Sequence, residues 1–120
     1  MYRLGIIEES LGCKDVLVIL VPYLANQRLE EVPGDTVPVW HTNEYHVPDS
    51  EILNLLPIFE EQILPTWYIH AFNEDVLIVV LKGKSFKISR EKDDSWNDMI
   101  VYGESVEVER RYLENIPLYV

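Results

Sequence analysis

The chain has 120 residues, of which 48% are hydrophobic, and its 21 acidic residues outnumber its 10 Lys and Arg to give a formal net charge of −11. This length fits one domain over residues 1–120, with enough apolar residues for a core. The negative charge argues against a nucleic-acid partner.

The N-terminal half is expected to contain two strands and two helices. The helix over 14–31 is ambiguous, because the apolar run 16–21 also fits a buried strand, whereas the leucines from Leu17 onward keep helical spacing. We predict the helix. Ser50 is the expected N-cap of the second helix. In chain order, the expected elements are a strand over 2–7, a helix over 14–31, a strand over 37–47 and a helix over 51–64.

The C-terminal half reads as three short strands separated by turn residues, which predicts an antiparallel meander. A short helix with Ser95 as its cap follows, and alternating side chains after it predict a last strand. The expected strands are 66–72, 76–81, 85–89 and 106–111, and the expected helix is 94–103. The fold class is therefore α+β: a mainly antiparallel sheet with a C-terminal-half β-meander and two to three helices, in a two-layer sandwich.

Three features of the sequence predict a cytoplasmic location. The longest apolar stretch, residues 16–25, is shorter than the roughly 20 residues that cross a bilayer. The segment before it mixes acids and bases and so lacks the basic flank of a signal peptide. Cys13 is the only cysteine, which excludes an internal disulfide and fits a reducing compartment. We therefore expect no membrane association.

The negative charge is concentrated in the middle of the chain, where residues 29–81 hold ten Asp and Glu and no Lys or Arg. Such a block should project negative potential and steer a basic partner. The sequence thus favours a non-enzymatic, acidic protein-binding module, such as an immunity- or antitoxin-like neutraliser, inhibitor or regulator of a basic protein. A homodimer is also open, because a basic hairpin could contact the acidic middle. The expected partner-binding residues are Glu30, Glu31, Glu44, Asp49, Glu51, Glu60 and Glu61.

The same block holds all three histidines, His41, His46 and His70. Side chains alternate along a strand, so Glu44 and His46 share one face and His41 lies on the other. If the strand of His70 is adjacent and in phase, His70 could join Glu44 and His46.

This geometry predicts an alternative function as a small acid–base or metal-dependent enzyme with catalytic Glu44, His46 and His70. A divalent metal would take His41 as a further ligand. No recognised catalytic or metal-binding spacing supports it, so we expect no cofactor. A third interpretation is a pH switch, because histidines in a negative field should have raised pKa values.

Overall fold

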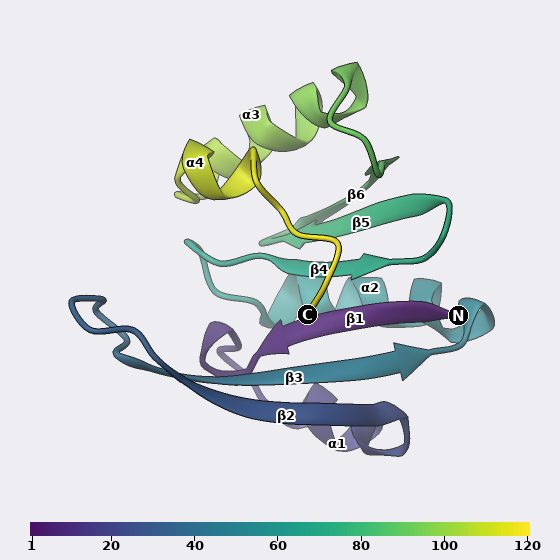
Figure 1. Cartoon of the computed structure of the whole chain (residues 1–120), viewed down its shortest axis with the longest axis vertical. Coiled ribbons are helices and arrows are strands. Elements are labelled where there is room, and N and C mark those ends of the chain that lie inside the picture. The colour runs from purple at the N-terminus through teal and green to yellow at the C-terminus, as the bar shows by residue number, and fades with distance from the viewer.

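The structure is a computed structural model that describes the whole chain, Met1 to Val120. It contains an antiparallel six-stranded sheet in the order β2-β3-β1-β4-β5-β6, with helices on both faces (Figure 1). The α+β prediction is confirmed, and β4, β5 and β6 form the expected meander. The strands are β1 (Tyr2–Ile7), β2 (Leu24–Glu31), β3 (Val39–Val47), β4 (Ile69–Phe72), β5 (Val76–Leu81) and β6 (Lys84–Ser89). The helices are α1 (Asp15–Leu20), α2 (Asp49–Gln62), α3 (Asn97–Ser105) and α4 (Arg110–Leu113), with 3₁₀ turns at Glu8–Ser10, Val21–Tyr23 and Asp94–Trp96.

One face of the sheet is covered by α1 and α2 (Figure 1). Leu4 and Ile6 project to this face from β1, because alternate residues of a strand share a side. They join Phe59 of α2 in a buried apolar cluster. Pro57 lies inside α2, yet the helix continues to Gln62.

On the opposite face, α3 and α4 cover only β4, β5 and β6, and the C-terminal segment packs beside them and reaches Gly5 of β1. A second buried cluster joins Leu77 and Val79 of β5 to Trp96, Met99 and Leu113. Because β5 is buried on both faces, its sequence is continuously apolar rather than alternating. The expected two layers thus become three over this half of the sheet, and the same face of β1, β2 and β3 is left without a helix.

The helix predicted over 14–31 is wrong beyond Leu20. Pro22 falls in a 3₁₀ turn that ends the helix, and Leu24–Glu31 then forms β2, an edge strand paired with β3 along its length. The polar residues of this segment looked like a helix surface. They are instead the exposed side chains of an edge strand, and pairing with β3 overrides their local preference.

The strand predicted over 106–111 is also wrong, because this segment never meets a partner strand. The N–H groups of Val106 and Val108 turn back to the carbonyl of Gly103 at the end of α3, and α4 begins at Arg110. The two predicted caps differ as well. Asp93, rather than Ser95, caps the 3₁₀ turn before α3, and no side chain caps α2, where Ser50 was expected.

None of the helices combines the length and the apolar character that crossing a bilayer would require.

Candidate functional site

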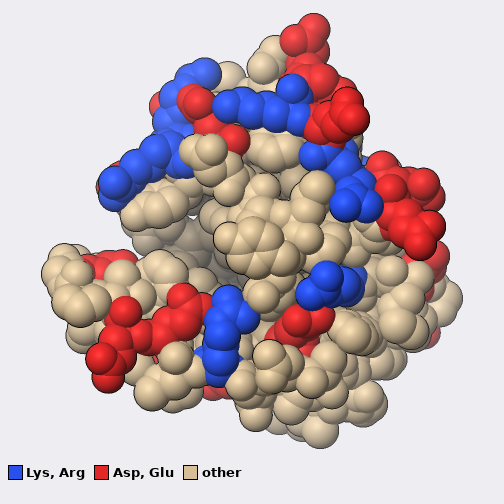
Figure 2. Space-filling model, viewed as in Figure 1, with Lys and Arg blue, Asp and Glu red and all other residues tan.

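The uncovered face of β1, β2 and β3 forms the floor of a cleft with a volume of about 730 Å³. Its walls are the β2–β3 loop, the connection from α3 to α4 with α4 itself, and the C-terminal segment. Figure 2 shows this hollow on the face turned to the viewer, with side chains of both charges around it. The cleft exists because α3 and α4 cover only half of the sheet.

Aromatic side chains line much of the cleft. Trp40 of β3 and Trp67, just before β4, meet edge to face with their ring centroids 5.2 Å apart, and Trp40 Nε1 donates to the Val37 carbonyl at 2.9 Å. Burial, followed by the charge of Tyr119, raises the pKa of Tyr68 to about 12. Trp40 and Trp67 thus come together although β1 separates β3 from β4.

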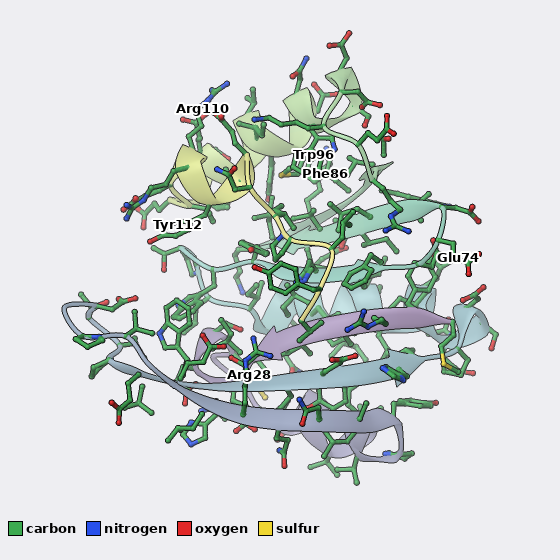
Figure 3. All side chains as sticks on the ribbon, in the orientation of Figure 1. Arg28, Glu74, Phe86, Trp96, Arg110 and Tyr112 are labelled. Atoms are coloured by element: carbon green, nitrogen blue, oxygen red, sulfur yellow. The ribbon has the colours of Figure 1, made fainter.

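Two arginines reach the cleft, and each is paired with a carboxylate. Arg28 Nε lies 2.9 Å from Glu30 Oε1, which also accepts from the Thr42 hydroxyl at 3.0 Å. Arg111 Nε lies 2.6 Å from Glu109 Oε2. In Figure 3, Arg28 lies on the sheet and Tyr112 on α4, on opposite sides of the cleft. Neither arginine is a free anion receptor.

Two further carboxylates line the cleft, Asp35 in the β2–β3 loop and Glu107 between α3 and α4. Asp35 accepts hydrogen bonds only within its own turn, and Glu107 makes no ion pair. Glu107 and Thr66 have φ of +70° and +77°, and the Thr66 N–H donates to the Val106 carbonyl at 3.0 Å. Left-handed backbone at non-glycine residues costs on the order of 1–3 kcal/mol and clusters at functional sites.

His70 lies at the inner end of the cleft, under the C-terminal segment. Its Nε2–H donates to the Tyr119 carbonyl at 2.9 Å. Burial lowers the pKa of His70, against the raising effect of that hydrogen bond, and the charge of Arg3 lowers it further. The ring lies over Gly5, where an added Cβ would stand 2.7 Å from Cε1. His70 is therefore neutral near pH 7, and Nδ1 carries its lone pair. The expectation of a raised pKa is wrong for this histidine.

The predicted catalytic set is only partly assembled. His46 Nε2 lies 2.8 Å from Glu44 Oε2, as expected for two residues on one strand face. Arg3 Nε approaches the same oxygen at 2.9 Å, and this hydrogen bond, reinforced by the one from His46, holds the pKa of Glu44 below its usual range despite partial burial. β1 separates the pair from His70, because Gly5 is the register partner of both Glu44 and His70.

The predicted metal ligands do not meet. His41 points to the other face of the sheet, where its Nδ1 lies 2.6 Å from Glu9 Oε2 and its backbone N–H donates to the same carboxylate. No group of three or more His, Cys, Asp or Glu side chains is placed so that it could hold a metal ion. The set of His41, Glu44, His46 and His70 is therefore not a metal site in this fold, because the alternation of β3 and the intervening β1 keep its members apart.

The seven predicted partner-binding acids lie on different sides of the molecule. Glu30 and Glu44 face the cleft side of the sheet, each beside an arginine, and Glu31 faces the other side. The other four belong to α2, behind the sheet. Two of these have partners: the amino terminus lies 2.5 Å from Asp49, and the Ser85 hydroxyl donates to Glu60 at 2.5 Å. Asp49, Glu51 and Glu61 are exposed, and of these Glu51 and Glu61 make no ion pair.

Sequence reasoning missed Asp35 and Glu107 because no local pattern joins residues so far apart in the chain. Nothing in the sequence shows that the rings of Trp40 and Trp67 meet. Comparisons with protein-family models, with curated proteins and with solved structures find no match to this chain.

Proposed function

We propose that the protein is a non-enzymatic binding module that captures a cationic side chain of a basic protein partner in the cleft between the sheet and α4. The observation that carries the proposal is the pair of carboxylates, Asp35 and Glu107, that lines an aromatic cleft and makes no ion pair. The function is the acidic protein-binding role expected from the charge, and the proposed contact surface is the cleft rather than α2.

The chemistry of the lining favours a cation over an anion. Both arginines are already paired with carboxylates, so an incoming anion would have to break an existing ion pair. A Lys or Arg side chain would instead gain Asp35 and Glu107 as partners and could lie against Trp40 or Trp67. Cation–π contacts of this kind contribute about 0.5–2 kcal/mol, with Trp the best ring.

The overall charge would assist the encounter. A formal charge of −11 attracts a basic protein from a distance and accelerates association, and the effect weakens with salt. The acids of α2 contribute to this long-range attraction without touching the partner, whereas the cleft supplies the specific contact.

A titration with a lysine- and arginine-rich peptide that lacks aromatic residues tests the proposal, with the fluorescence of Trp40 and Trp67 as the signal. The double variant Asp35→Asn, Glu107→Gln should weaken binding by about threefold to tenfold, since both carboxylates are exposed and exposed ion pairs contribute roughly 0.2–1 kcal/mol each.

The matched control is Glu51→Gln, Glu61→Gln, which removes the same charge from α2 and should change affinity less than about twofold. Equal losses of affinity in the two double variants would contradict binding in the cleft and indicate diffuse attraction by net charge. Absence of any peptide binding by the unaltered protein would remove the proposed function.

A second candidate function is acid–base chemistry by His70. The observation in its favour is that the Tyr119 carbonyl fixes the tautomer of a neutral ring at the cleft, which leaves Nδ1 as a base. The test is Nδ1 chemical shift perturbation during a screen of small neutral and cationic ligands. Ligands that bind only at the tryptophans and leave His70 unshifted would count against it.

A further inference from the structure

The free edge of β2 is the longest uncovered backbone edge in the fold. Figure 1 shows β2 as the outermost strand, with no element beside it in the plane of the sheet. The Val32 N–H, just after β2, donates to the Pro38 carbonyl, just before β3, at 2.8 Å. Hydrogen-bonding direction alternates along a strand, so Glu30 and Arg28 also turn toward β3. The N–H and C=O groups of Gln27, Leu29 and Glu31 therefore point outward, unpaired.

The edge carries only part of the usual protection against strand pairing. Arg28, Glu30 and Glu31 are charged, but no proline or covering loop blocks the strand. Here Leu29 is 60% exposed at the centre of the edge, and the first proline, Pro33, comes after the strand ends. The only irregularity is a bulge between Leu24 and Asn26, at the beginning of β2. Residues 27–31 are thus free to accept another strand.

We propose that this edge pairs with the same edge of a second copy of the chain, antiparallel and centred on Leu29. In this register Leu29 lies opposite Leu29 of the second copy, Arg28 lies opposite Glu30, and Gln27 lies opposite Glu31. Each chain already holds an Arg28–Glu30 ion pair at 2.9 Å. Two-fold symmetry brings the two ion pairs together as a four-charge cluster of alternating sign, so the pairing is self-complementary in charge without breaking either one.

Like-charge contacts also disfavour the neighbouring registers. Outward-facing residues must pair with outward-facing residues, so the centre can move only in whole-residue steps along the strand. Centring the pair on Arg28 opposes two arginines, and centring it on Glu30 or Glu31 opposes two carboxylates, which is destabilising. Centring it on Gln27 leaves Arg28 opposite Asn26. The register centred on Leu29 alone gives two opposite-charge pairs.

The test exploits this symmetry. The variant Arg28→Glu places carboxylates opposite each other in a self-pair, and Glu30→Arg places guanidinium groups opposite each other. In each variant alone, the dissociation constant of the dimer should rise by about tenfold or more, because two attractive contacts become repulsive. An equimolar mixture should associate again, since the two acidic positions of one variant then face the two basic positions of the other. Sedimentation velocity from micromolar to millimolar protein measures all three samples.

Leu29→Pro provides an independent variant that keeps the β2–β3 ladder. The N–H of Leu29 points outward, so proline removes an edge donor without removing a bond to β3. We expect this variant to be folded by circular dichroism and to lose self-association as the single-charge variants do. A chain that stays monomeric up to the millimolar range overturns the proposal. So does association that Leu29→Pro leaves unchanged, or single-charge variants whose mixture associates no better than its components.

Discussion

Gly5 is the residue on which the position of His70 depends, and Gly5→Ala tests this. The added Cβ would stand 2.7 Å from His70 Cε1 and 3.2 Å from Val120 Cγ2, whereas carbon atoms pack best at about 3.5–4.0 Å. Overpacking of this kind costs about 1–3 kcal/mol. Displacing the ring also loses its hydrogen bond to Tyr119, worth about 1 kcal/mol.

Alanine offsets part of this loss, because it costs about 0.5–1 kcal/mol less backbone entropy than glycine in a strand. The balance is a loss of about 1–3 kcal/mol in the free energy of unfolding. For a domain of this size that corresponds to a fall in Tm of about 4 °C for each kcal/mol. Urea denaturation monitored by tryptophan fluorescence measures the free energy directly.

The control is the same substitution in a His70→Ala background, where the ring is absent and alanine at position 5 should be neutral or slightly stabilising. The double-mutant cycle should therefore show a coupling of at least about 1 kcal/mol between the two positions. Additive losses, or a Gly5→Ala protein as stable as the unaltered chain, would refute the packing of His70 over Gly5.

Three further predictions concern ionisation. The folded pKa of His70 is lowered chiefly by burial, so its protonation favours the unfolded chain: stability present above about pH 6.5 is lost as pH falls through the folded pKa. Lowering the pH from about 7.5 to about 5 should therefore reduce the free energy of unfolding, measured by urea denaturation, less in His70→Gln than in the unaltered protein. Equal reductions in the two proteins would contradict this. Arg3→Met should raise the pKa of Glu44, followed by carboxyl NMR titration, and cost about 1 kcal/mol or less; an unchanged pKa would show that Arg3 does not hold that carboxylate. Burial raises the pKa of Tyr68 to about 12, so Tyr68→Phe should leave the tyrosinate absorbance at about pH 10.5 unchanged. A lower absorbance in the variant at that pH would show that the Tyr68 hydroxyl ionises like an exposed one.

Elements whose sequence carries its own period were predictable. The bounds of β1 follow from Tyr2, Leu4 and Ile6 on one face, and those of β5 from an uninterrupted apolar run. The apolar stripe of α2 likewise identified a helix that begins and ends within two residues of its predicted bounds. In these segments, local periodicity and tertiary burial agree.

Elements that depend on a distant partner were not predictable. The polar segment that forms β2 has no strand period of its own and becomes a strand because β3 pairs with it. Val106 and Val108 alternate with acids as a strand would, yet their N–H groups bond to α3 because no strand lies within reach. In these segments the backbone hydrogen-bond partners within reach decide the structure more than the β-propensity of the residues does.

The sequence by itself determined the charge, the α+β class and the local pairing of Glu44 with His46, since two residues on one strand face meet wherever that strand lies. Only the tertiary structure decided that β1 would separate this pair from His70 and that Asp35 would share a cleft with Glu107. The physical reason is strand order. Strand order is set by long-range backbone pairing and by which apolar faces can be buried together, and no short stretch of residues encodes either.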